Sequence, residues 1–383
     1  MASALYIHWP FCLQKCPYCD FNSHVRDQVD TPRWQAAMLA DMRAEAELAG
    51  GEPLKSVFFG GGTPSLMPPS LVGTLLAEAE RLWGFAPEIE ITLEANPSSV
   101  EAEKFADLAA AGVNRTSLGL QALDDEKLKF LGRLHDTQEG LKALEVAQKA
   151  FARVSFDLIY ALPGHQPDQW ENELRQAMSF GTSHLSLYQL TIEPGTRFET
   201  LVRRGEFVPL DDDASADLFA VTQQLTSQAG LPAYEISNHA RMGEESRHNL
   251  TYWHYQDYVG IGPGAHGRRS GFATQRHRKP ENWLAAVEQR ASGCQHELAI
   301  SAKEQVAEAL LMGLRLADGL DFEALSSRFA LPLSQLINAD ELRNLDALGF
   351  AWSRGNRIGI TPKGMPLLDA ILPRLVPDDL VLA

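Results

Sequence analysis

The segment Cys12-Leu-Gln-Lys-Cys16-Pro-Tyr-Cys19 holds three of the four cysteines of the 383-residue chain. A disulfide framework spreads its cysteines along a chain, so this dense spacing indicates a metal site instead. Thiolates are the ligands that iron–sulfur clusters take, and three of them on one loop can bind three irons of a four-iron cubane. The fourth iron is then open to a ligand, because the remaining cysteine lies far along the chain. The alternative is a zinc site whose fourth ligand is His8 or His24.

Outward from this loop, short β-rich runs alternate with helical stretches as far as Leu190. Leu5–His8, Leu54–Phe59 and Val154–Tyr160 are typical of strands, and Pro69–Trp83 is typical of a helix. This alternation predicts a parallel sheet of the α/β class. Polar residues recur in or just after the predicted strands, at Gly60–Thr63, Glu94, Gln121, Asp157 and Gln189. Because a barrel gathers the carboxyl ends of its strands at one mouth, the pattern favours a partial or complete (β/α) barrel.

The pattern changes after residue 210, and we expect three parts: a barrel core over residues 1–210, an extension with a linker over 211–295, and a C-terminal domain over 296–383. In the extension, Tyr234–Ser237 is predicted to form a strand and Arg268–Pro280 a linker. In the C-terminal domain, several helices and a two-stranded wing around Gly355 predict an α+β winged-helix-like unit. Acidic side chains outnumber basic ones there, which disfavours a DNA-reading role.

The charge balance excludes several classes of partner. There are 34 basic and 50 acidic side chains, and the formal net charge is −16. Such a surface repels phosphate backbones, so no nucleic-acid partner is expected. No apolar run reaches the roughly 18 residues that a membrane helix needs, and the N-terminus lacks the basic and apolar regions of a secretory signal. We therefore expect a cytoplasmic protein with no membrane span.

The C-x3-C-x2-C spacing, near the N-terminus and after one strand, resembles the cluster motif of the radical S-adenosylmethionine (SAM) enzymes. The resemblance implies a radical SAM partial (β/α) barrel and one [4Fe–4S] cluster on Cys12, Cys16 and Cys19. It also implies that the amino and carboxylate groups of SAM chelate the open iron. In that superfamily the reduced cluster cleaves SAM to a 5′-deoxyadenosyl radical.

Further residues match positions that hold SAM in the resembled superfamily. Gly60-Gly61-Gly62-Thr63 follows the second predicted strand, and glycines let a backbone approach a ligand without obstruction by Cβ atoms. The resemblance implies that this segment holds the methionyl ammonium group, and that Glu94 accepts hydrogen bonds from the ribose hydroxyls, which suits a carboxylate. The other positions of the implied SAM site are Tyr6, Tyr18, Gln121, Arg133 and Asp157.

Nearly the whole chain resembles the coproporphyrinogen III oxidase-like family, and two features concern its branches. The oxygen-independent oxidase has a further cysteine two residues after the third, where this chain has Phe21. The segment His248-Asn-Leu-Thr-Tyr252-Trp253 looks like the H-N-x-x-Y-W pattern of the haem chaperone branch, the HemW proteins. The Gly262–Gly267 segment formally matches a dinucleotide fingerprint, but it contains Pro263 and no βαβ unit follows, so a loop close to the active site is expected.

This resemblance implies a haem chaperone that binds the cluster, SAM and haem, and delivers haem to a haemoprotein acceptor such as a respiratory one. A reductant protein would serve the cluster. Haem needs an imidazole or thiolate ligand and flat apolar walls, which His248, Tyr252 and Trp253 can provide. His266 is the alternative iron ligand, with His248 then holding its loop by hydrogen bonds; on the residues alone, an aromatic packing cluster also explains the motif. The alternative function is the oxidase itself, which converts coproporphyrinogen III to protoporphyrinogen IX by oxidative decarboxylation.

Overall fold

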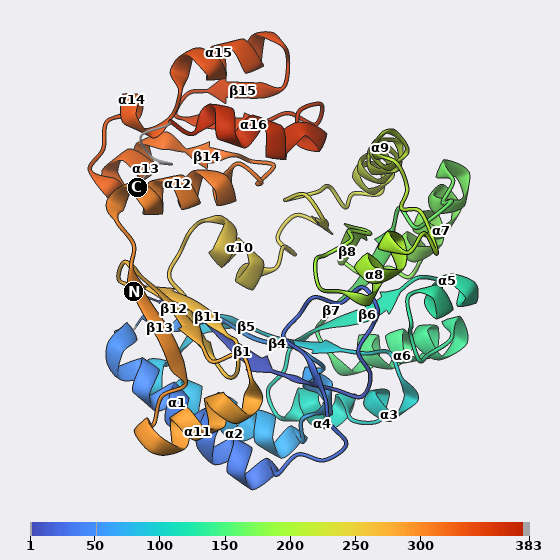
Figure 1. The fold of residues 1–383 in the computed structure, drawn as a ribbon, viewed down its shortest axis with the longest axis vertical. Coiled ribbons are helices and arrows are strands. Elements are labelled where there is room, and N and C mark those ends of the chain that lie inside the picture. Colours follow the sequence, from blue (N-terminus) through green and yellow to red (C-terminus); the bar gives the residue numbers. More distant parts are fainter. Residues whose placement is uncertain (1, 51, 378–383) are drawn as a thin grey trace.

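A curved eight-stranded sheet forms the centre of the protein, and the computed structural model describes residues 2–50 and 52–377 (Figure 1). The strands are ordered β10-β1-β4-β5-β6-β7-β8-β9, and every neighbouring pair is parallel except β8 and β9. Their bounds are β1 Ala4–Trp9, β4 Leu54–Gly61, β5 Phe85–Ala95, β6 Arg115–Gln121, β7 Arg153–Tyr160, β8 His184–Gln189, β9 Asn238–Ala240 and β10 Val259–Ile261. The sheet is therefore the predicted partial barrel of an α/β protein.

Helices connect the parallel strands and cover the sheet's outer face (Figure 1). The helices of this part are α1 Thr31–Ala49, α2 Pro69–Trp83, α3 Ser99–Ala102, α4 Phe105–Ala110, α5 Asp125–Phe130, α6 Thr137–Ala150, α7 Pro167–Ser179, α8 Arg197–Arg203, α9 Asp212–Gln228, α10 Arg247–Trp253 and α11 Pro280–Arg290. Helix α2 shows why they form, because it begins at a proline, ends before Gly84 at φ +72°, and buries Leu71, Leu75 and Ala79 at helical spacing. Helix α1 is capped by Asp30, whose side chain accepts from the Arg33 N–H.

Residues 302–375 build a separate C-terminal unit with its own apolar core (Figure 1). Its elements are α12 Ala302–Gly313, β14 Leu320–Asp321, α13 Phe322–Phe329, α14 Leu333–Leu336, α15 Ala339–Ala347, β15 Ala351–Arg354, β16 Arg357–Ile360 and α16 Leu368–Leu375. The predicted wing is present, since β15 and β16 pair antiparallel around Gly355 at φ +58°, and β14 adds a third strand. Tyr255 of the barrel extension joins this core, and its hydroxyl donates to Glu308 of α12.

Two expectations for the extension are wrong. Tyr234–Ser237 is a turn, and the strand is the next segment, β9. Arg268–Pro280 is not a linker, because it contains the second half of β11 His266–Arg269 and all of β12 Phe272–Arg276, which with β13 Cys294–Ala299 make an antiparallel sheet. Ser270 and Gly271 connect β11 and β12 with φ values of +51° and +79°, the backbone signature of a tight hairpin turn.

Candidate functional site

The cysteine loop lies across the mouth of the barrel. Phe11–Cys12, strand β2, pairs with His24–Val25, strand β3, so the two ends of the loop are tied together. On the opposite side of the mouth, Gln14 Nε2 donates to the carbonyl oxygen of Gly132 over 3.2 Å, and the Phe198 N–H donates to the carbonyl oxygen of Pro17 over 2.9 Å. The loop is therefore held at both sides over the carboxyl ends of the strands.

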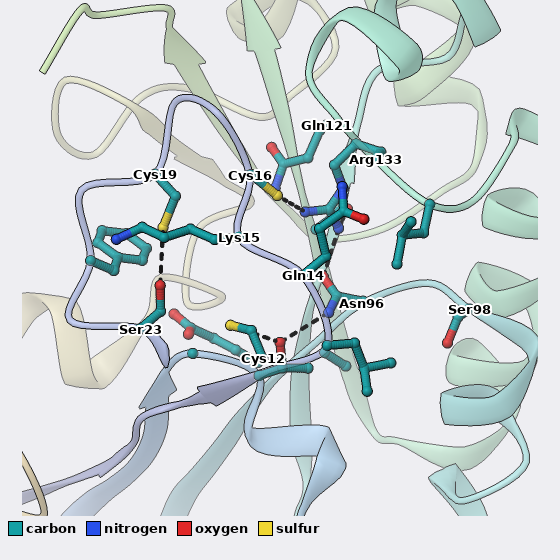
Figure 2. A pocket seen from close by; sticks show the side chains of 18 of the residues that line it. Cys12, Gln14, Lys15, Cys16, Cys19, Ser23, Asn96, Ser98, Gln121 and Arg133 are labelled. Atoms are coloured by element: carbon teal, nitrogen blue, oxygen red, sulfur yellow. Dashed lines mark hydrogen bonds between the residues drawn. The ribbon is translucent and has the colours of Figure 1, made fainter. Parts of the chain in front are cut away.

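The sulfur atoms of Cys12, Cys16 and Cys19 surround one space, which Figure 2 shows from close by, and all three thiols are free. They line a cavity of about 190 Å³. Each sulfur has polar neighbours: Thr63 Oγ1 lies 3.5 Å from Cys12 Sγ, Arg133 Nη1 lies 3.4 Å from Cys16 Sγ, and Ser23 Oγ lies 3.8 Å from Cys19 Sγ.

The donor set fits a cubane better than a single ion. Among the described residues, no three His, Cys, Asp or Glu side chains lie close enough together to hold one metal ion. A cubane does not need that convergence, because each thiolate binds a different iron. His8 is also unsuited as a zinc ligand here, since its Nδ1 and Nε2 atoms lie 3.0 Å from the Tyr6 hydroxyl and 2.9 Å from the Asn22 carbonyl oxygen.

The three glycines at the end of β4, Gly60 to Gly62, are required first by packing within the protein. A Cβ atom on Gly60 would lie 2.8 Å from the Tyr6 ring, and one on Gly61 would lie 2.6 Å from the ring of His8. A Cβ atom on Gly62 would lie 2.7 Å from the carbonyl oxygen of Phe11, at the start of the cysteine loop. Gly61, Gly62 and Thr63 line the cavity as well, whereas Gly60 is not among its lining residues.

Two acids line the cavity, Glu94 near the end of β5 and Asp157 within β7, and both are partly buried. Glu94 Oε2 accepts from the Gly61 N–H over 3.2 Å, and Asp157 Oδ1 accepts from the Ser117 hydroxyl over 3.1 Å. Burial, with the charge of Asp157 adding to it, raises the pKa of Glu94 to about 8. Burial also raises the pKa of Asp157 to about 6, against the opposing effect of hydrogen bonds from serine hydroxyls.

Two further predicted residues have polar atoms without a partner in this cavity. Gln121 Oε1 and Arg133 Nε are buried and make no hydrogen bond, and Gln121 also has a left-handed backbone at φ +72°. Unsatisfied polar groups and backbone strain together are typical of a ligand site. The other Arg133 donors reach Cys16, the Gly119 carbonyl oxygen at 2.9 Å and Asn96 Oδ1 at 2.6 Å (Figure 2). The cavity therefore fits a polar ligand beside a cluster.

Asn96 was missed by the sequence analysis. Its Nδ2 donates to Thr63 Oγ1 over 3.1 Å and its Oδ1 accepts from Arg133, so it joins the neighbours of two cysteines. Its position two residues after Glu94, at the same strand end, is the signal that points to it. Tyr18, a predicted site residue, also lines the cavity and packs its ring 6.3 Å from that of Phe198.

A second cavity, of about 380 Å³, adjoins the first and shares Phe21, Gly61 and Glu94 with it. Tyr6 and Tyr252, both predicted site residues, line this second cavity and not the first. Gly264 and His266 also line it, so the Gly262–Gly267 segment lies close to the site, as expected. A Cβ atom on Gly264 would lie 2.4 Å from Asn22 Nδ2, which itself donates to the carbonyl oxygens of Pro263 and Arg278.

His248 and Trp253, assigned to haem with Tyr252, line neither cavity. His248 is buried, with Nδ1 2.9 Å from Ser56 Oγ and Nε2 2.7 Å from the Tyr252 hydroxyl. Burial lowers the pKa of His248 to about 3, so the ring is neutral and both its nitrogens are used within the protein. Trp253 lies toward the C-terminal unit, under the Arg315 guanidinium. This geometry favours the alternative in which His248 holds its helix by hydrogen bonds.

Comparison with known proteins defines the class of the chain. The family model described as "Radical SAM superfamily" matches residues 6–177 of the chain, and the model described as "HemN C-terminal domain" matches residues 300–367. With the partial barrel and the cysteine loop, these matches define a radical SAM protein. No helix in the described part of the chain combines the length and the apolar character that crossing a membrane requires.

Similar proteins show to which family within the radical SAM superfamily the chain belongs. The chain is 45% identical to "Heme chaperone HemW" of Escherichia coli K12 over 69% of this chain and 70% of the relative. It is 35% identical to HemW of Mycobacterium tuberculosis H37Rv over 97% and 94%, and 36% identical to "Radical S-adenosyl methionine domain-containing protein 1, mitochondrial" of Bos taurus over 98% and 87%. The solved structure of E. coli HemN, a coproporphyrinogen III oxidase, superposes with a TM-score of 0.82 over 97% and 89% at 20% identity, which shows a shared fold. The chain belongs to the HemN/HemW family of radical SAM proteins.

Proposed function

We propose that this protein is a haem chaperone that binds one [4Fe–4S] cluster, SAM and haem, and passes haem to a haemoprotein. The observation that carries the proposal is the 35–45% identity to proteins named as heme chaperones, over most of the chain. Phe21 supports it, because the resembled oxidase has its additional cysteine at this position. A haemoprotein acceptor, a reductant protein and a cytoplasmic location belong to the same proposal; the last needs its own test, since some relatives carry "mitochondrial" in their names.

The residues around the first cavity have distinct roles in this proposal. Cys12, Cys16 and Cys19 would hold the cluster, which when bound supplies an open iron for SAM and an electron for its cleavage. Glu94 would accept the ribose hydroxyls, since its Oε2 atom has one backbone donor and the carboxylate has capacity for more. Arg133 and Gln121 would use their unpartnered Nε and Oε1 atoms toward the ligand.

We expect SAM binding to tighten as the pH rises toward 8. The pKa of Glu94 is raised to about 8, so the free protein carries the protonated acid below that pH. Ribose hydroxyls donate to the carboxylate, so binding releases a proton and affinity rises by up to about tenfold per pH unit below the pKa. Above the pKa this gain ends.

Equilibrium dialysis of the anaerobic, cluster-loaded protein at pH 6.5, 7.5 and 8.5 measures this dependence. Glu94→Gln keeps the size and shape of the side chain but cannot titrate. Any pH dependence that remains in this variant therefore comes from other groups, including those of SAM, and this makes it the matched control. At pH 8.5 the variant should bind about 1.5–3 kcal/mol more weakly, because a charged acceptor is lost. Equal pH profiles for the two proteins would remove Glu94 from the ribose contact.

The proposed function is separated from that of the oxidase by two assays on one preparation. The cluster-loaded protein should bind haem saturably, release it to an apo-haemoprotein, and form no protoporphyrinogen IX from coproporphyrinogen III in the presence of SAM and a reductant. The E. coli HemN enzyme serves as the positive control for turnover. Steady formation of protoporphyrinogen would assign the oxidase function instead, and absence of haem binding would remove the chaperone function.

A further inference from the structure

The second cavity is lined by aromatic side chains, and an exposed aromatic side chain lies at its edge. Tyr6, Tyr252 and Tyr258 line it, with the rings of Tyr252 and Tyr258 in edge contact at 4.6 Å between centroids. Phe21 stands at the boundary with the first cavity, and 59% of its surface is exposed. Exposing a large aromatic side chain to water is unfavourable, and a flat apolar ligand lying against the ring would cover this apolar surface.

His266, at the start of β11, presents an imidazole to this cavity that the protein barely uses. Its Nε2 atom lies 3.5 Å from Gln275 Nε2, at the outer limit of a hydrogen bond, and the ring is exposed. His8, the other histidine lining this cavity, is buried and has both nitrogens hydrogen-bonded. Burial and the nearby Arg278 charge lower the pKa of His266, which keeps the ring neutral as a metal ligand must be.

Arg278 adds an available cation to the same cavity. The neighbouring arginines of this segment are engaged: Arg269 and Arg276 form ion pairs with Glu45, and the Arg268 guanidinium stacks 3.6 Å above the centre of the Tyr255 ring. The Arg278 side chain is exposed and pairs with no acidic residue of residues 2–50 and 52–377. It can therefore meet a carboxylate of a bound ligand.

We propose that the second cavity is the haem site, with His266 as the iron ligand and Arg278 paired with a haem carboxylate. The inference rests on the proposed function, because the relatives named as heme chaperones are the reason to consider haem. The three kinds of group match the three parts of the ligand: aromatic walls for the apolar macrocycle, an imidazole for the iron and a cation for the carboxylates.

The position of this cavity also suits a chaperone. Phe21, Gly61 and Glu94 belong to both cavities, so haem would lie directly beside the space surrounded by the three cysteines. Phe21, His266 and Arg278 are exposed, so one edge of the haem would remain open to solvent. An acceptor protein can reach a ligand that is held at an open edge more readily than one enclosed in the core.

Titration of the cluster-loaded protein with ferric haem, followed by the Soret absorbance, tests the assignment. His266→Ala should weaken binding at least tenfold and remove the spectrum of ligated haem, and free imidazole should restore that spectrum. His254→Ala, at an exposed histidine that lines neither cavity, is the matched control and should bind as the wild type does. Circular dichroism and iron content establish that each variant is folded and keeps its cluster.

The carboxylate contact has a separate test. Arg278→Gln should bind haem several-fold more weakly, but should bind haem dimethyl ester, which lacks the negative charges, as well as the wild type does. Wild-type affinity and spectrum in His266→Ala would overturn this site while leaving the chaperone function intact. Failure of the wild-type protein to bind haem would instead overturn the proposed function. An equal loss for haem and its ester in Arg278→Gln would remove the carboxylate pairing.

Discussion

Replacement of any one of Cys12, Cys16 and Cys19 by Ala should abolish the iron–sulfur cluster. The wild-type protein, purified without oxygen, should be brown and carry about four iron and four sulfide per chain. The three thiols line one cavity, and no fourth cysteine is near enough to replace one that is lost. Iron and sulfide analysis, together with the visible absorbance of the cluster, measures the outcome.

Cys294→Ala is the matched control for this prediction. Its sulfur lies at the start of β13, where it contacts the carbonyl oxygen of His296 over 3.2 Å, and it does not line the cysteine cavity. The variant should keep the full iron content and the full absorbance. Stoichiometric zinc with no iron in the wild-type protein would contradict the cluster assignment and restore the zinc alternative.

The convergence of the site followed from the order of the elements along the chain. Parallel strands end at the same edge, so residues after successive strands had to meet there. Glu94, Gln121 and Asp157 accordingly line one cavity. Gln189 was predicted at the same mouth, but its Nε2 donates to the Ser215 carbonyl oxygen and it does not line the cavity. Local sequence does not indicate which helix lies above a strand end.

The segment from Arg268 to Pro280 shows why the extension was harder to predict. Its arginines read as exposed linker residues, because charged side chains are rarely buried without partners. The partners of Arg269 and Arg276 are Asp41 and Glu45, which lie on α1, more than two hundred residues earlier. His248 was misleading for a similar reason, since Ser56 and Tyr252 occupy its nitrogens only in the folded chain.

Arg276→Met should be the most destabilising single change outside the apolar core. The guanidinium is fully buried, with Nε 3.1 Å from Asp41 Oδ2 and Nη2 2.8 Å from Glu45 Oε2. Methionine fills a similar volume but leaves Asp41 as a buried, unpaired charge, at a cost of about 3–5 kcal/mol in the free energy of unfolding. Urea unfolding followed by tryptophan fluorescence is a suitable measurement, because Trp283 Nε1 lies 3.3 Å from Asp41.

A change at Arg33 is the control for Arg276→Met, because it removes an exposed ion pair and leaves no buried charge unpaired. Arg33→Met also removes a contact of α1, with Glu288 of α11, but both side chains are exposed to solvent, so the expected loss of stability is much smaller. Adding Asp41→Asn to Arg276→Met should recover part of the stability, because it removes the unpaired charge. Asp41 also accepts a hydrogen bond from the Gly262 N–H, in the loop beside the second cavity. A change that displaces Asp41 should therefore also displace this loop, and should weaken haem binding as well as stability. Equal losses in the Arg33 and Arg276 variants would mean that burial of the network contributes nothing.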